Sequence, residues 1–197
     1  QRSFAHLRSC RLLGCEDITL TYGSGMRLTN SITDYDERWP SFYWAEAKRL
    51  RPIFGDASVE LHHVGSTAVE GLAAKPEIDI LVVVSDPSRL AQWQAELLRL
   101  GYRRGGDLME GHHFFKRDEG GVRTHKLHIC PSGHSQVSRM LGIRDRLRGN
   151  LSDRRAYAEL KLRLEGENRT GIAEYLNAKA PFLDDLYRKS QGGLKID

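Results

Sequence analysis

The sequence His63-Val64-Gly65-Ser66, followed after ten residues by Glu77-Ile78-Asp79-Ile80, decides the fold. The second stretch opens a β-branched run that predicts a strand buried on at least one face. Side chains alternate along a strand, so Glu77 and Asp79 point the same way, roughly 6–7 Å apart. Ile78 and Ile80 then face the core.

Two carboxylates on one strand face repel each other unless a cation lies between them. Mg²⁺ prefers oxygen ligands and bridges carboxylates to phosphates, so Glu77 and Asp79 predict a site for Mg²⁺ or Mn²⁺. A solvated strand face is the alternative interpretation.

The segment before this strand is suited to an anion. Gly65 lets the backbone approach a phosphate, Ser66 supplies a hydroxyl donor, and Lys75 reaches the same anion as a flexible point charge. A Gly-Ser pair that forms only a turn is the alternative here.

Length and composition indicate one globular domain, because the chain has 197 residues, 40% of them hydrophobic and 28% charged. No apolar run approaches the roughly 20 residues that cross a bilayer, so no membrane is expected. Three cysteines without a C-x-x-C pair predict a reducing, cytoplasmic location. Residues 1–30 are interpreted as an N-terminal extension with a short strand at 18–22, and residues 31–197 as one domain.

Hydrophobic spacing and turn residues predict the remaining elements. Ser152 is the expected N-cap of the middle C-terminal helix, and Pro181 is expected to kink or break the last one. The pattern indicates an α/β or α+β sandwich with a helical C-terminal part from about residue 135. Helices are expected over residues 36–55, 87–100, 135–148, 153–165 and 171–188, and strands over 59–64, 78–84, 112–117 and 122–130.

Charge is uneven along the chain. Residues 31–98 carry 6 basic and 11 acidic side chains, a net of −5, whereas residues 99–148 carry 11 and 5, a net of +6. The basic hairpin predicts a triphosphate clamp made of Lys116, Arg123 and Lys126. No Lys/Arg-rich run or DNA-reading module is present, so duplex DNA is not an expected partner. Arg144 and Lys161 are candidates to cover a bound nucleotide, and solvated helix residues are the alternative.

Several segments resemble the GrpB family, within the polymerase-β-like nucleotidyltransferase superfamily, whose signature is an h-G-[GS] turn followed by [DE]-h-[DE]-h. The resemblance implies a mixed sheet flanked by helices. Two positions depart from the family pattern: Glu70 stands where proline is usual, and Glu77 where many members carry an aliphatic residue. The resemblance covers residues 35–40, 63–69, 71–76, 78–80, 100–102, 113–116, 125–128, 144–145 and 178–182.

The superfamily commonly adds a third carboxylate from a neighbouring strand, and the resemblance places His128 at that position. His128 is therefore a candidate metal ligand, general base or phosphate contact, and His113 a candidate nucleotide contact. A zinc hydrolase site built from strand histidines is an alternative, with His112 or His113, His125, His128 and Asp79 as ligands. Buried packing roles for these histidines are also consistent with the pattern.

Together the residues and the resemblance imply a metal-dependent nucleotidyltransferase. It would move a nucleoside monophosphate from ATP or another nucleoside triphosphate to an unidentified small-molecule or macromolecular acceptor. Gly65 and Ser66 would hold the phosphates, Glu77 and Asp79 the metal, and His128 the acceptor. The alternative is a nucleotide- or RNA-binding module that performs no transfer.

Overall fold

A computed structural model gives the structure of the chain and describes residues 30–55, 59–169 and 171–192. The predicted extension, with its short strand at 18–22, lies outside the described residues except for Asn30.

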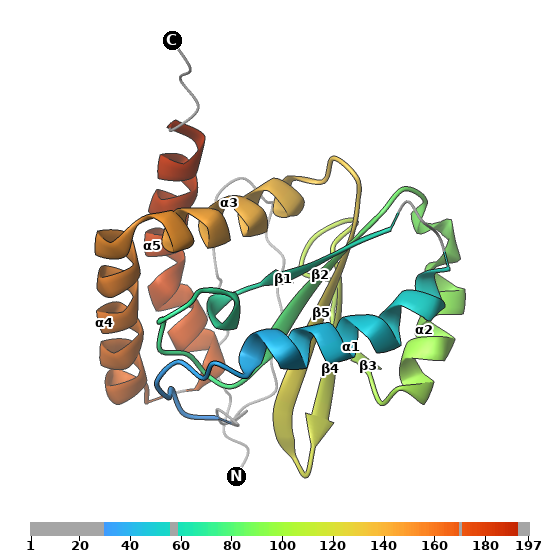
Figure 1. Cartoon of the computed structure of the whole chain (residues 1–197), viewed down its shortest axis with the longest axis horizontal. Coiled ribbons are helices and arrows are strands. Elements are labelled where there is room, and N and C mark those ends of the chain that lie inside the picture. Colours follow the sequence, from blue (N-terminus) through green and yellow to red (C-terminus); the bar gives the residue numbers. More distant parts are fainter. Residues whose placement is uncertain (1–29, 56–58, 170, 193–197) are drawn as a thin grey trace, which may run out of the picture.

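A mixed five-stranded sheet forms the centre of the molecule (Figure 1). Its order is β1-β2-β5-β4-β3; β2 and β5 pair in parallel, and the other neighbours pair antiparallel. The predicted mixed sheet is thereby confirmed, and the two-residue strand β3 was not predicted. The strands are β1 (Glu60–Val64), β2 (Ile78–Val84), β3 (Arg103–Arg104), β4 (His113–Glu119) and β5 (Val122–Pro131).

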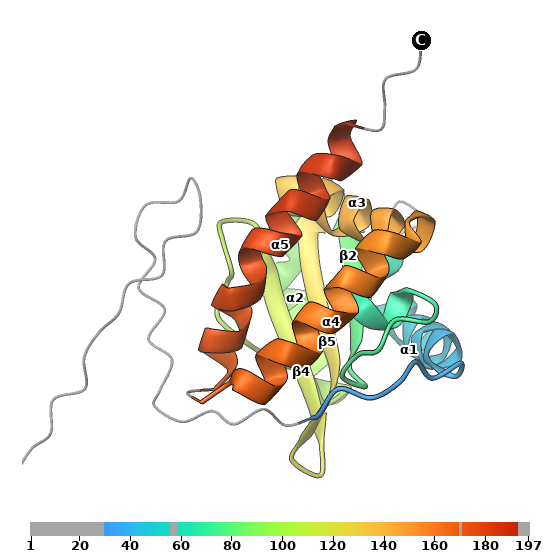
Figure 2. The same cartoon turned by 90° about the vertical axis from the view of Figure 1, so that its left-hand side faces the viewer.

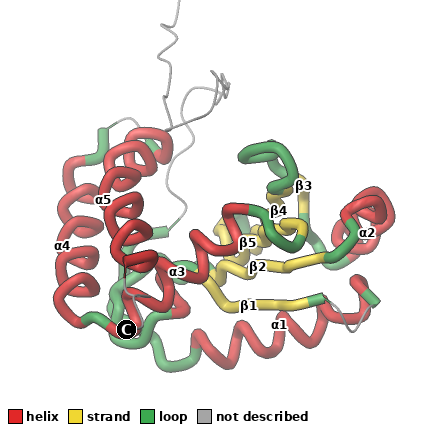
Figure 3. Tube along the Cα trace, turned by 90° about the horizontal axis from the view of Figure 1, so that it is seen from above, coloured by secondary structure: helices red, strands yellow, loops and turns green. Residues whose placement is uncertain are grey.

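Helices cover both faces of this sheet. Figure 3 shows α1 running along one side of the strands, with α3 on the other side and α4 and α5 gathered at one end. Figures 1 and 2 both show α4 beside α5. The predicted helical C-terminal part is confirmed. The helices are α1 (Trp39–Phe54), α2 (Leu90–Arg99), α3 (Ser135–Gly149), α4 (Leu151–Glu167) and α5 (Ile172–Gly192).

Alternation along β2 divides the core between the two faces. One face of β2 packs under α1 and α2, against side chains such as Trp39 and Trp93. This face consists of Ile78, Ile80, Val82 and Val84. Leu81 and Val83 point the other way and pack under α3 with Cys130. A third cluster joins the C-terminal helices to the loop after β1 through Val69, Leu72, Leu147, Tyr157 and Leu186.

Two local expectations about the C-terminal helices were wrong or only partly met. Asn150, not Ser152, caps α4, because its side-chain oxygen accepts a hydrogen bond from the Asp153 amide at 2.8 Å. Helix α5 continues through Pro181 without a break. Packing of α5 against α3 and α4 stabilises the helix there, although proline offers no amide donor.

A buried polar cluster joins α1 to the hairpin. Arg117 donates to Glu46 at 2.8 Å and to His125 Nδ1 at 2.9 Å, and the Tyr102 hydroxyl donates to Glu46 at 3.0 Å. Burial alone would raise the pKa of Glu46, but Arg117 and its neighbours lower it. The carboxylate therefore stays ionised in the core.

Replacing Arg117 by methionine should destabilise the fold by about 3–5 kcal/mol, because it removes the buried charged partner of Glu46 and leaves that carboxylate only the half-exposed Arg49. Urea unfolding measures this loss. The matched control is Arg99→Met, which breaks the exposed Arg99–Glu96 pair at 2.5 Å and should cost under about 1 kcal/mol. Equal losses in the two variants would contradict the assignment.

The stability of the fold should fall as the pH drops from about 6.5 towards 4. Burial is the main cause that lowers the pKa of His63 to about 4, of His112 to about 3 and of His125 to about 4. The unfolded chain therefore takes up protons that the folded chain refuses, at about 1.4 kcal/mol per pH unit for each histidine. Unfolding free energies at pH 7 and pH 5 check this, and His125→Gln should show a shallower slope than the parent chain.

Candidate functional site

The two carboxylates singled out by the sequence face one ammonium group. Lys126 Nζ lies 2.5 Å from Glu77 Oε2 and 3.9 Å from Asp79 Oδ1. Lys126 is the direct neighbour of Asp79 in the parallel β2–β5 pairing. The expected shared orientation of Glu77 and Asp79 is confirmed, and Ile78 and Ile80 are buried in the core as predicted.

The Gly65-Ser66 turn lies directly against Asp79. Gly65 has a φ of 72°, and a Cβ atom there would lie 2.8 Å from the Asp79 carboxyl carbon, so only glycine fits. Ser66 shares a side-chain hydrogen bond with the buried Tyr157 hydroxyl. The Thr67 hydroxyl donates to the Glu77 carbonyl at 3.2 Å, which ties the turn to β2.

Lysines from four segments of the chain lie at or next to these carboxylates; Lys75, Lys126, Lys161 and Lys179 are called the lysine cluster. Lys75, Lys126 and Lys179 act on one or both carboxylates, and Lys161 lies next to Lys179. Three of these ammonium groups lie over the rings of two tyrosines. Those of Lys75 and Lys179 lie 4.9 and 5.2 Å from the centre of the Tyr175 ring. Lys161 lies 4.8 Å from the centre of the Tyr157 ring and donates to the Ala73 carbonyl. Aromatic faces stabilise cations at such distances.

The electrostatics of the lysine cluster differ from those of a solvated surface. Burial and Lys126 lower the pKa of Lys179 to about 8, and burial and Lys179 lower that of Lys161 to about 7. Burial alone would lower the pKa of Lys126, but Asp79 and Glu77 raise it. Burial would raise the pKa of Asp79, but Lys126 and His128 lower it. Neighbouring ammonium groups in the cluster therefore repel one another, and a bound anion would reduce this repulsion.

His128 lies beside Asp79, on the strand the sequence predicted. Its Nε2 atom is 3.8 Å from Asp79 Oδ1, and its Nδ1 atom is 2.9 Å from His112 Nε2. Its ring also packs against Phe114, with the two ring centres 5.2 Å apart. Both nitrogens of His128 thus have a polar neighbour, which orients the ring towards the carboxylate.

The other predicted residues divide between the two sheet faces. Lys116 is directly opposite Lys126 and shares its face, and Arg123 pairs with Asp118 across the hairpin. His113 lies on the opposite face, the one covered by α1, and contacts Asp107 at 3.1 Å. His113 is therefore not brought to the carboxylates, because side chains alternate along β4.

The two residues proposed to cover a nucleotide have different surroundings. Arg144 donates to the His63 carbonyl at 3.1 Å and pairs with Asp145. Lys161 belongs to the lysine cluster. Lys75, predicted as an anion contact, lies 3.6 Å from Glu165.

The donor atoms here do not fit a divalent cation. One Glu77 oxygen is bound by Lys126, and the other accepts a hydrogen bond from the Asn30 amide at 3.2 Å. Within residues 30–55, 59–169 and 171–192, no group of three His, Cys, Asp or Glu residues is suited to hold a metal. The alternative zinc site is not assembled either. His125 is hydrogen-bonded to Arg117 and lies, like His113, on the sheet face opposite Asp79 and His128.

Sequence reasoning missed the residues that α5 contributes. Tyr175 and Lys179 lie four positions apart on α5, and Tyr157 and Lys161 have the same spacing on α4. Residues at this spacing lie on one face of a helix. Lys161 was already a candidate, and the repeated Tyr-x-x-x-Lys pattern is the signal that could have identified Tyr175 and Lys179.

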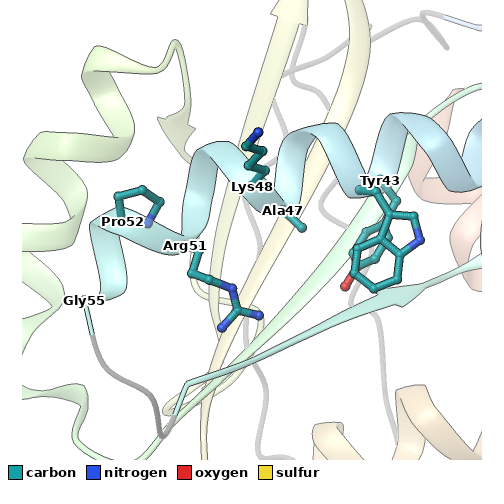
Figure 4. A pocket seen from close by; sticks show the side chains of 7 residues that line it. Tyr43, Ala47, Lys48, Arg51, Pro52 and Gly55 are labelled. Atoms are coloured by element: carbon teal, nitrogen blue, oxygen red, sulfur yellow. The ribbon is translucent and has the colours of Figure 1, made fainter.

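A separate surface pocket of about 630 Å³ lies along α1 (Figure 4). No residue predicted for the site lines it. Trp44, 67% exposed, contributes its largest apolar side chain. The pocket lining consists of Tyr43, Trp44, Ala47, Lys48, Arg51, Pro52 and Gly55.

No helix in the described part of the chain combines the length and apolar character needed to cross a membrane.

Comparisons with known proteins identify the family of the chain. A UPF0157 protein of Halalkalibacterium halodurans is 37% identical over 163 residues, which cover 81% of this chain and 82% of that protein. A UPF0157 protein of Pseudomonas aeruginosa is 38% identical over 168 residues, covering 79% and 67%. The crystal structure of the conserved protein GrpB from Enterococcus faecalis matches with a TM-score of 0.77 at 30% identity, covering 83% of this chain and 98% of that one.

A weaker structural match is the Cid1 poly(U) polymerase bound to MgATP, with a TM-score of 0.44 at 16% identity over 66% of this chain and 45% of that chain. The model of the family described as GrpB protein matches residues 29–189. The chain therefore belongs to the GrpB family.

Proposed function

We propose that the site binds the phosphate groups of a nucleoside triphosphate. The observation that supports this proposal is the lysine cluster: Lys126 and Lys179 lie near Asp79, and the Gly65-Ser66 turn lies against the same carboxylate. Burial and neighbouring ammonium groups lower the pKa of Lys75, Lys161 and Lys179, and such a concentration of positive charge favours a ligand with several negative charges.

Access from solvent supports the same proposal. The Lys126 side chain keeps 30% of its surface exposed and that of Asp79 keeps 19%. A phosphate can therefore approach Lys126 without prior unfolding. Gly65 presents only backbone to such a ligand, which allows close contact.

Transfer of a nucleoside monophosphate to a small-molecule or macromolecular acceptor is the second candidate function. It is favoured by Asp79, which stays ionised beside His128 and remains partly exposed. Asp79 or His128 would accept the proton from an acceptor group, and the lysine cluster would neutralise charge on departing pyrophosphate. No metal-bound step is part of this proposal.

Calorimetric titration of ATP, in Mg²⁺ or in EDTA, tests the binding site. Lys126→Met should weaken ATP binding about 10- to 100-fold, because a charge-assisted hydrogen bond contributes about 1.5–3 kcal/mol. The matched control is Lys48→Met, which removes an exposed lysine of α1 and should bind ATP like the parent chain. Absence of ATP binding at millimolar concentration, or equal effects of the two variants, would contradict the proposal.

Asp79→Asn separates transfer from binding. If transfer occurs, the variant should still bind ATP but release no pyrophosphate from it, since the amide cannot accept the proton. The measurement is pyrophosphate release during incubation with ATP and a pool of candidate acceptors. Release that survives in Asp79→Asn would rule out the role given to this carboxylate.

ATP affinity should increase as the pH falls from about 9 to about 7. The pKa of Lys179 is about 8 and that of Lys161 about 7, so both lysines gain a proton in or near this range and attract phosphate more strongly. Lys179→Met should lose the part of the increase centred near pH 8. Calorimetry at several pH values measures it, and an unchanged profile in Lys179→Met would refute the contribution of this lysine.

A further inference from the structure

We propose that the Lys126 ammonium is the resident counter-cation of the Glu77–Asp79 pair and takes the place of a divalent metal ion. The carboxylate pair then binds no Mg²⁺ or Mn²⁺ in the natural chain. A second part of the inference rests on the function proposed above: phosphates are bound at this site without a divalent cation.

The Lys126 ammonium lies where a cation shared by both carboxylates would lie. Lys126 Nζ is 2.5 Å from Glu77 and 3.9 Å from Asp79, so one cation already serves both carboxylates. Two carboxylates that share a strand face need such a cation. A dication in the same place would meet the ammonium at close range and would be repelled.

The fold holds the ammonium in this place. Parallel pairing of β2 with β5 sets Asp79 beside Lys126, and the position before it, Ile78, beside His125. The second Glu77 oxygen is occupied as well, since the Asn30 amide donates to it and to the Arg123 carbonyl. Moving Lys126 aside would therefore remove the ammonium from the buried Glu77 carboxylate and leave the neutral Asn30 amide hydrogen-bonded to it.

The surroundings add further positive charge. Lys179, on α5, adds positive charge near both Asp79 and Glu77, and Lys75, in the loop before β2, adds it near Glu77. His128 Nε2 is 3.8 Å from Asp79 Oδ1, and His128 Nδ1 lies 2.9 Å from His112 Nε2. Removal of the Lys126 charge alone would leave the two carboxylates on one strand face without their shared cation, and carboxylate oxygens are ligands that suit Mn²⁺.

The test is a titration of the full chain with Mn²⁺ alone, in which electron paramagnetic resonance measures the free ion. Lys126→Met should bind Mn²⁺ at least tenfold more tightly than the natural chain. The double variant Lys126→Met/Asp79→Asn should lose this gain, and Lys48→Met should bind like the natural chain. ATP is absent, so failure of this inference and failure of the proposed function are seen separately.

Lys126→Arg and a second readout keep the test decisive if Lys126→Met folds poorly. Lys126→Arg retains a cation and should show the weak Mn²⁺ binding of the natural chain. Where Lys126→Met is unstable, its melting temperature should rise with Mn²⁺, because a ligand that binds only the folded state stabilises it. Two results would overturn the inference. One is that the natural chain binds Mn²⁺ through Asp79 as tightly as Lys126→Met does. The other is that Lys126→Met shows no gain in Mn²⁺ binding by either readout.

Discussion

The contact between the Gly65 backbone and the Asp79 carboxylate is the constraint on which the site depends. A side chain at position 65 would collide with Asp79, so the turn after β1 must pass the end of β2 as bare backbone. This close approach puts Ser66 near the carboxylates and lets Thr67 bind the Glu77 carbonyl. The antiparallel pairing of Val64 with Asp79 continues the same arrangement into the sheet.

The C-terminal helices complete what the sheet begins. The sheet and its loops contribute the carboxylates, Lys75 and Lys126, whereas α4 and α5 contribute Lys161 and Lys179, each on the ring of a tyrosine one turn earlier. Hydrophobic contacts of Tyr157 with the loop after β1 hold the helices against the sheet. The site therefore exists only where the two packing units meet.

Local patterns predicted every strand except the short β3, and the shared face of Glu77 and Asp79, because alternation depends on neighbouring residues alone. They did not predict which cation lies between the carboxylates. That depends on the pairing of β2 with β5, which brings Lys126 beside Asp79 across a long separation in sequence. The same non-local register decides that His128 faces the carboxylates and His113 the opposite side. The lysines of α4 and α5 needed the packing of helices on the sheet, which no local period specifies.

The parallel pairing of β2 with β5, called the seam between them, also affects the kinetics of folding. These strands pair in parallel although α2, β3 and β4 lie between them in the chain. Pairing of such distant segments is slow, since closing a long loop costs entropy before its contacts form. Asp79 and Lys126 meet across this seam. A chain folding from the unfolded state is therefore expected to form its hairpin and helices first, and its ligand site in one of the last steps.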